Sequence, residues 1–176
     1  MHGARVHSGP DCVALTEVGA VLLDIEGTTT PIEFVHQTLF GYARERVRGF
    51  LDRHWENPEV GADIARLESE HAAEPSQPAP PPWRDDAAAV AAYVYWLMDR
   101  DRKSTGLKSL QGKIWDEGYR SGDLRSVVYP DVPPALERWR GRGTDVAIFS
   151  SGSVQAQRSL FSNTAAGDLT RFIRAY

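Results

Sequence analysis

Two short apolar runs without polar alternation stand out along the chain, at residues 20–23 and 146–149. Such runs are typical of strands in a parallel sheet that helices cover on both faces. Asp24 follows the first run directly, and Ser150 and Ser151 follow the second. The pattern therefore predicts two parallel strands that carry polar side chains at their carboxyl ends.

Between the two runs, apolar positions recur at helical spacing instead. A first helix is expected after Thr30, because Thr30 can cap it, the proline that follows suits its first position, and Glu33 can complete a capping box. Asn57 is expected to start a second helix, and Asp85 or Asp86 a third. Further helices are predicted over residues 107–119, 133–141 and 153–161.

This order of elements predicts an α/β fold with a Rossmann-like parallel sheet. Residues 1–30 and 127–176 are expected to form a partial α/β core, and residues 31–126 an all-helical insertion after the first strand. Residues 74–82, "EPSQPAPPP", contain five prolines and are expected to form an extended linker within the insertion. Ligands of open parallel sheets bind beyond the carboxyl ends of the strands, so the site is expected there.

Composition narrows the class of protein. A length of 176 residues fits one domain with a modest insertion, and a formal net charge of −4 argues against a general nucleic-acid binder. No segment has the length and hydropathy of a membrane span, and the first dozen residues lack the apolar stretch of a signal peptide. The single cysteine, Cys12, cannot form an internal disulfide, which favours a reducing, cytoplasmic location.

Asp24 and Glu26 form the most suggestive chemical pattern, an acid-x-acid pair directly after a buried strand. A carboxylate held at a strand end can bind Mg²⁺ and attack a phosphoryl group. Glu26, two residues on, can pass a proton to the leaving oxygen. Gly27 allows the backbone to approach the phosphate, whose charge backbone N–H groups can stabilise. Alone, the pair could equally be a solvated turn.

Four stretches together resemble one family of hydrolases. Residues 24–35, "DIEGTTTPIEFV", are similar to the first motif of the haloacid dehalogenase superfamily, in the form found in the enolase-phosphatases of methionine salvage (acireductone synthases). The second acid of the motif is glutamate rather than aspartate, which points to this family. The other stretches similar to the family are "DRKSTGLKSLQGKIW" (101–115), "PDVPPALERW" (130–139) and "FSSGSVQAQRSLF" (149–161).

The resemblance implies a haloacid dehalogenase-like core with a helical cap, formed here by residues 31–126. It implies that Asp24 is the nucleophile or an electrostatic anchor, that Glu26 does acid–base work, and that both help to bind Mg²⁺. It also implies that Ser150 and Ser151 bind the substrate phosphate. The substrate implied is a small phosphorylated diketone, 2,3-diketo-5-methylthiopentyl 1-phosphate, which a monomeric enzyme converts to an acireductone and phosphate.

One departure from the family concerns the residues after Ser153. The superfamily uses a core lysine and a further metal-binding acid there, but no lysine follows Ser153 and the only later acid is Asp168. We therefore expect this chain to be the first part of an enolase-phosphatase, without the later strands of the core. Apolar residues, among them Phe149, Phe161 and Ile173, are then expected to lack covering partners. A non-catalytic remnant and another phosphatase of the superfamily remain alternatives.

Several other residues have an ordinary structural interpretation. His36 is expected at the surface or the edge of the core, and Ser153 is expected to cap a helix. Arg102 and Lys103 could face the phosphate or simply lie at a solvated helix end. The aromatic residues of the insertion are expected to pack against one another rather than to bind a methylthio group; they are Tyr93, Tyr95, Trp96 and Trp115.

Overall fold

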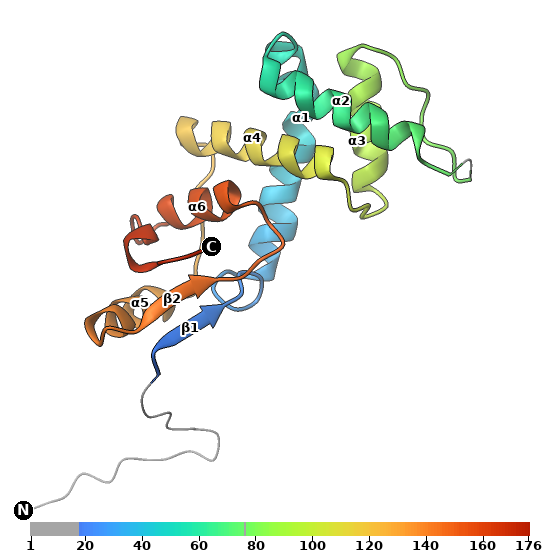
Figure 1. The fold of residues 1–176 in the computed structure, drawn as a ribbon. Helices are drawn as coiled ribbons and strands as arrows, with labels where there is room; N and C mark the ends of the chain where they lie inside the picture. Colours follow the sequence, from blue (N-terminus) through green and yellow to red (C-terminus); the bar gives the residue numbers. More distant parts are fainter. Residues whose placement is uncertain (1–17, 76) are drawn as a thin grey trace, which may run out of the picture.

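A parallel sheet joins the two apolar runs of the sequence (Figure 1). Strand β1 (Ala20–Leu23) pairs with β2 (Asp145–Ile148), in a register that places Leu23 beside Ile148, so both strands end at the same edge. The computed structural model describes residues 18–75 and 77–176, and Cys12 lies outside these ranges. The two predicted strands are therefore confirmed.

The end of the chain lies along the other side of β2. The N–H of Arg174 donates to the carbonyl oxygen of Val146 at 2.7 Å, and the N–H of Ile148 donates to that of Ala175 at 2.9 Å. Strand β2 is thus paired on both sides, and the side chains of Val146 and Ile148 are buried.

Strand β1 is less covered than its apolar sequence predicts. Leu22 is 66% exposed, although an apolar run without alternation suggested burial on both faces. Phe149 is 72% exposed, as expected for an apolar residue without a covering partner, but Phe161 and Ile173 are buried. The expectation for these two residues was wrong because helix α6 (Val154–Ser162) and the end of the chain enclose them in one cluster with β2.

Helices supply the rest of the described structure. They are η1 (a π-helix, Phe34–Leu39), α1 (Phe40–His54), α2 (Pro58–Ala72), α3 (Ala87–Met98), α4 (Thr105–Ser121), α5 (Val132–Gly141), α6 (Val154–Ser162) and η2 (a 3-10 helix, Thr170–Phe172). Within residues 18–75 and 77–176, none of them is long and apolar enough to cross a membrane. Residues 77–82 and the described part of 74–76 contain neither helix nor strand.

Several helix starts follow the capping residues of the sequence. The side chain of Asn57 accepts hydrogen bonds at the start of α2, and Asp86, rather than Asp85, accepts one at the start of α3. Gly122 ends α4 with a φ of 83°, in the left-handed region that glycine adopts readily.

The first helix begins after Thr30 as predicted, but its form differs from the prediction. The expected capping box is absent, because Glu33 makes no capping hydrogen bond and the buried hydroxyl of Thr30 has no partner among the described residues. The helical segment instead opens into the wider turns of η1 before continuing as α1. Short π-helical segments are rare and occur often at functional sites.

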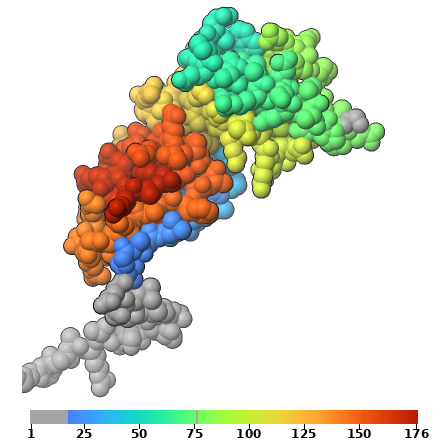
Figure 2. All heavy atoms as spheres, in the orientation of Figure 1, coloured from blue at the N-terminus to red at the C-terminus, as the bar shows by residue number. Residues whose placement is uncertain are grey.

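The chain has two clusters of buried apolar side chains. One gathers residues of α1 to α4, including Tyr93, and the other gathers residues of β2, η1, α5 and α6 together with Tyr119 of α4. Helices α2 and α3 and the two strands lie at opposite ends of the molecule (Figures 1 and 2). Tyr42 and Trp115 pack against both clusters. We propose that the clusters correspond to the predicted helical cap and α/β core.

Candidate active site

The loop after β1 is held by hydrogen bonds that converge on one carbonyl group. The oxygen of Ile25 accepts from the backbone N–H groups of the three consecutive threonines, at 2.9 to 3.3 Å. Gly27 turns the loop with a φ of 70°, and the hydroxyl of Thr29 donates to the carbonyl oxygen of Asp24 at 3.1 Å. The threonines therefore build the loop, and the loop fixes the position of Glu26.

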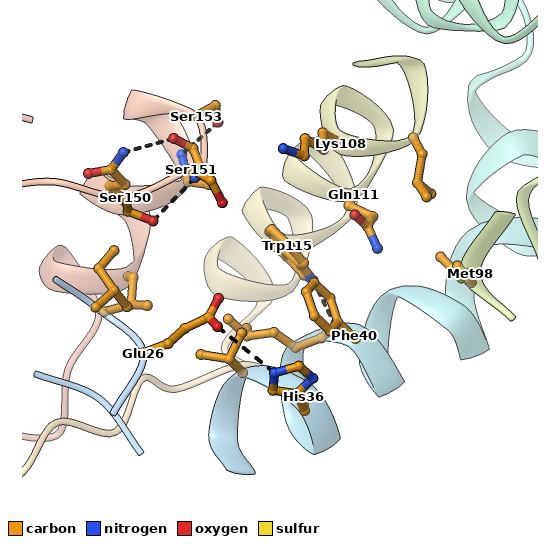
Figure 3. A pocket seen from close by; sticks show the side chains of 18 of the residues that line it. Glu26, His36, Phe40, Met98, Lys108, Gln111, Trp115, Ser150, Ser151 and Ser153 are labelled. Atoms are coloured by element: carbon orange, nitrogen blue, oxygen red, sulfur yellow. Dashed lines mark hydrogen bonds and ion pairs between the residues drawn. The ribbon is translucent and has the colours of Figure 1, made fainter. Parts of the chain in front are cut away.

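The two predicted acids occupy different places in this loop. Asp24 lies exposed at the end of β1, where its Oδ1 accepts from the N–H of Ile25 at 2.7 Å. Glu26 projects into a cavity, and its Oε2 lies 3.9 Å from Nε2 of His36 on η1. Figure 3 shows this pair at the base of the cavity. Asp24 is not among the described residues that line the cavity wall.

The loop after β2 brings the serines to the same cavity. Ser150 and Ser151 both line it, and Oγ of Ser150 accepts from the N–H of Gly152 at 3.2 Å (Figure 3). Nε2 of Gln157 donates to the carbonyl oxygen of Gly152 at 2.8 Å, which ties the loop to α6. Ser153 caps α6 through the N–H of Ala156, as predicted.

The cavity has a volume of about 550 Å³ and lies between the strand ends and the helices η1, α1 and α4. Its polar end carries Glu26, Ser150 and Ser151. Its walls are largely apolar and aromatic; they include Val35, Leu39, Phe40, Leu97, Met98, Leu107, Trp115 and Leu160. Pockets of this size, with apolar walls and a few polar groups, are the usual form of a small-molecule site.

Positive charge reaches the cavity from the helical part of the chain. Lys103 and Lys108 line it, and neither forms an ion pair with any described residue. Arg102 also lines the cavity, but its guanidinium is paired with Oε2 of Glu74 at 2.6 Å. Arg102 and Lys103 therefore differ. Arg102 is held by Glu74, whereas Lys103 lines the cavity without an ion pair to a described residue.

Trp115 has a second role beside the packing predicted for it. All four aromatic residues for which packing was predicted lie in or against the helical cluster, and Trp115 also lies in the cavity wall beside Phe40 (Figure 3). Its Nε1 donates to the carbonyl oxygen of Leu39 at 2.7 Å, which fixes the ring. In the sequence, Trp115 follows Lys108 by seven residues, a spacing that places both on one face of a helix and was the available signal for this position.

Two further residues of the cavity wall were not predicted from the sequence to line a site. His36 faces Glu26 from a π-helix that no periodicity predicted. Gln111 lies in the wall between Lys108 and Trp115 on α4 (Figure 3). Both are polar residues within helical patterns, where a solvent-facing position is the ordinary expectation.

Tyr119 lines the same cavity without being a candidate base. Burial raises the pKa of its hydroxyl to about 12, and the hydroxyl of Ser126 donates to it at 2.8 Å. The phenol therefore stays protonated at neutral pH.

The residues present fit part of a magnesium site. Mg²⁺ prefers oxygen ligands and is often held by one or two carboxylates together with water and substrate phosphate. Asp24 and Glu26 supply two exposed carboxylates on one loop, which meets that minimum. Among the described residues, no group of three or more His, Cys, Asp or Glu side chains could hold a metal ion.

Known proteins resemble this chain along most of its length. The sequence profile of a haloacid dehalogenase-like hydrolase family matches residues 18–173. A protein named Enolase-phosphatase E1 from Synechococcus elongatus is 52% identical over 90% of this chain and 67% of its own length. Proteins of the same name from Sorangium cellulosum and Drosophila melanogaster are 49% and 43% identical, over 65% and 62% of their lengths. The chain therefore spans about two thirds of the length of these relatives.

A solved structure shares the fold. The UTR4 protein of Saccharomyces cerevisiae superposes with a TM-score of 0.70 at 31% identity, covering 91% of this chain and 66% of that one. The haloacid dehalogenase-like fold with its helical cap, predicted from the four sequence stretches, is confirmed. This fold and the sequence identity to these relatives show that the chain belongs to the enolase-phosphatase E1 family of haloacid dehalogenase-like hydrolases.

Proposed function

We propose that this chain carries the substrate site of a Mg²⁺-dependent enolase-phosphatase of methionine salvage. The reaction converts 2,3-diketo-5-methylthiopentyl 1-phosphate to the acireductone 1,2-dihydroxy-3-keto-5-methylthiopentene and phosphate. We further propose that the protein acts in the cytoplasm as a monomer. The relatives that support the proposal are phosphatases by name, at up to 52% identity.

The observation that carries the proposal is the two-ended character of the cavity. Glu26, Ser150 and Ser151 gather at one end, and Phe40 and Trp115 lie in an apolar wall. The proposed substrate has the same division, with a charged phosphate at one end and an uncharged thioether at the other. Thioether sulfur makes favourable contacts with aromatic rings, so the aromatic wall suits that end of the substrate.

In this proposal each polar residue has a defined task. The carboxylate of Asp24 attacks phosphorus, the bond from phosphorus to the substrate oxygen breaks, and the carboxyl group of Glu26 donates a proton to that oxygen. Water then attacks the aspartyl-phosphate, Glu26 accepts a proton from it, and phosphate leaves with the Asp24 carboxylate restored. The hydroxyls of Ser150 and Ser151 donate to phosphate oxygens. Asp24 and Glu26 would hold Mg²⁺, which would supply positive charge near the phosphoryl group.

Lys103 and Lys108 add positive charge to the site. Both line the cavity from the helical part of the chain, and neither forms an ion pair with a described residue. Charge placed in a partly enclosed cavity is screened less than charge at an open surface.

The test is phosphate release from the diketone phosphate in the presence of Mg²⁺. We expect Asp24→Asn to abolish release, because it removes the nucleophile without changing the shape of the side chain. We expect Glu26→Gln to slow release by about 10²- to 10⁴-fold, the usual contribution of a proton-transferring group. Asp131→Asn is the matched control, since Asp131 is exposed and its side chain caps nothing.

The alternatives give different outcomes in the same assay. Binding of the substrate without release under any condition would identify a non-catalytic remnant. Release from p-nitrophenyl phosphate as fast as from the diketone phosphate would identify a less selective phosphatase of the superfamily. Equal activity of Asp24→Asn and the unsubstituted chain would remove the loop after β1 from the chemistry.

A further inference from the structure

Gln111 is a largely buried residue on α4 whose amide forms no hydrogen bond with any described residue; the residue as a whole is 6% exposed. Neither polar atom of its amide is among the fully buried atoms that lack a partner, so the amide is open to the cavity that Gln111 lines. An amide that no protein group engages can offer a ligand both a donor and an acceptor there.

Both polar neighbours in the wall donate a hydrogen bond to a backbone carbonyl oxygen, although Oε1 of Gln157 is buried without a partner among the described residues. Trp115, one turn further along α4, donates to the carbonyl oxygen of Leu39. Gln157, which is 4% exposed and lines the same cavity, donates through Nε2 to the carbonyl oxygen of Gly152. Gln157 has a visible structural task for its amide N–H group, whereas Gln111 has none among the described contacts.

The position of Gln111 along α4 indicates which part of a ligand it meets. Lys108, Gln111 and Trp115 follow one another at helical spacing and all three line the cavity (Figure 3). The wall thus offers a cation, then an amide, then an aromatic ring. The proposed substrate offers a phosphate, then two adjacent carbonyl groups, then a thioether.

We infer that Gln111 is the specificity residue that binds the dicarbonyl part of the substrate. Nε2 donates to a carbonyl oxygen of the diketone, and Oε1 accepts from the hydroxyl group once an enol has formed. An amide carries both a donor and an acceptor, so one side chain serves both forms of the ligand. This inference rests on the proposed function, because it takes the diketone phosphate as the ligand.

The experiment measures binding rather than turnover. Two probes are compared in calorimetry with Mg²⁺: a 2,3-diketoalkyl phosphonate, and an alkyl phosphonate of the same length without the carbonyl groups. The unsubstituted chain should bind the diketone probe more tightly. Gln111→Met, which keeps the length of the side chain but removes the amide, should lose about tenfold in affinity for the diketone probe alone. Gln37→Met, at an exposed position of η1, is the binding control.

Stability separates a ligand-binding role from a structural one. Gln111→Met should unfold at the same or a higher urea concentration, because it removes no hydrogen bond to a described residue and places an apolar side chain at a largely buried position. Gln157→Met should unfold at a lower concentration, because it removes the hydrogen bond to Gly152. Equal loss of stability in both variants would make Gln111 structural and overturn the inference.

The binding data separate failure of this inference from failure of the proposed function. If the unsubstituted chain prefers the diketone probe and Gln111→Met keeps that preference, the inference is wrong and the proposed function stands. If the unsubstituted chain binds neither phosphonate, the proposed function fails, and the inference fails with it.

Discussion

Gly27 sets the direction in which Glu26 leaves the sheet. Its φ of 70° lies in the region that side chains disfavour, and a Cβ built there would meet nothing within 4 Å. Gly27→Ala should therefore destabilise the fold through backbone strain alone, by about 1 to 2 kcal/mol. Gly61 is the matched control, because it lies within α2 with equal space, and Gly61→Ala should stabilise by about 0.5 to 1 kcal/mol.

Urea unfolding of both glycine variants measures these changes. Opposite signs are expected for Gly27→Ala and Gly61→Ala. A Gly27→Ala variant as stable as the unsubstituted chain would mean that the loop after β1 has an alternative conformation of similar energy.

Mg²⁺ should bind weakly to the chain alone and more tightly when phosphate is present. Asp24 and Glu26 offer two carboxylates, and no larger group of ligating side chains exists among the described residues. Phosphate oxygens would add ligands of the kind that Mg²⁺ prefers. Thermal unfolding with Mg²⁺, with phosphate and with both should show a combined shift larger than the sum of the separate ones. Asp24→Asn should abolish the difference, and tight binding that survives it would place the metal elsewhere.

The residue scale also shows what a sequence can and cannot reveal about a site. Glu26, Ser150 and Ser151 could be predicted to converge because the carboxyl ends of parallel strands share an edge. His36 and Gln111 could not, because each is one polar residue in a helical pattern, and only the folded chain turns it toward the cavity. Trp115 was assigned to packing, and the structure gives it packing and cavity lining together.

Helices α2 and α4 are joined by a largely buried ion pair. Nζ of Lys113 lies 2.6 Å from Oδ2 of Asp63, which is 1% exposed, and Lys113 also donates to the hydroxyl of Ser109. Asp63→Ala leaves the ammonium of Lys113, whose side chain is 24% exposed, without this partner. Breaking a fully buried pair typically costs about 3 to 5 kcal/mol, so this partly exposed pair should cost less than that but more than an exposed pair.

The exposed pair on α1 provides the control for this prediction. Arg48 and Asp52 form an ion pair at 2.9 Å within one helix, with both side chains about half exposed. Asp52→Ala should cost no more than about 0.5 kcal/mol, because solvent screens pairs of this kind. Similar unfolding midpoints for the Asp63→Ala and Asp52→Ala variants would mean that the largely buried pair contributes no more than the exposed one.

Elements with strong local signals were the easiest to predict. Asn57 and Asp86 cap their helices as their residue types indicate, and both strands occur where the apolar runs lie. The helix after Thr30 begins where it was predicted, but the capping box was wrong, because the N–H of Thr30 that Glu33 would engage donates to the carbonyl oxygen of Ile25 instead. The predicted burial of Leu22 was wrong for another reason, because coverage of a sheet depends on segments distant in the sequence.

At the scale of the whole molecule, the sequence indicated the order of the parts but not the contacts between them. The helical insertion and the flanking α/β segments could be separated by the change in periodicity. Contact across the boundary could not be foreseen, because it depends on Tyr42 and Trp115, which pack against both apolar clusters. The cavity lies beside that contact and is lined from both parts.

The two clusters differ in how far apart their members lie along the chain. The helical cluster is built from one continuous stretch, residues 43–114, whereas the sheet must bring together segments such as Val18 and Thr144, 126 positions apart. Closing so long a loop is entropically costly, and contacts between distant segments form slowly. During refolding the cap should therefore acquire protected amides before the sheet does.

Pulse-labelling hydrogen exchange during refolding tests that order. Amides of α1 and α4 should be protected in an earlier phase than the amides of Ile148 and Phe149, which bond across the sheet. Simultaneous protection would mean that the two clusters fold as one unit. If the order holds, the helical insertion folds first and shortens the effective loop between β1 and β2. It thereby speeds the assembly of the sheet edge at which both strands end.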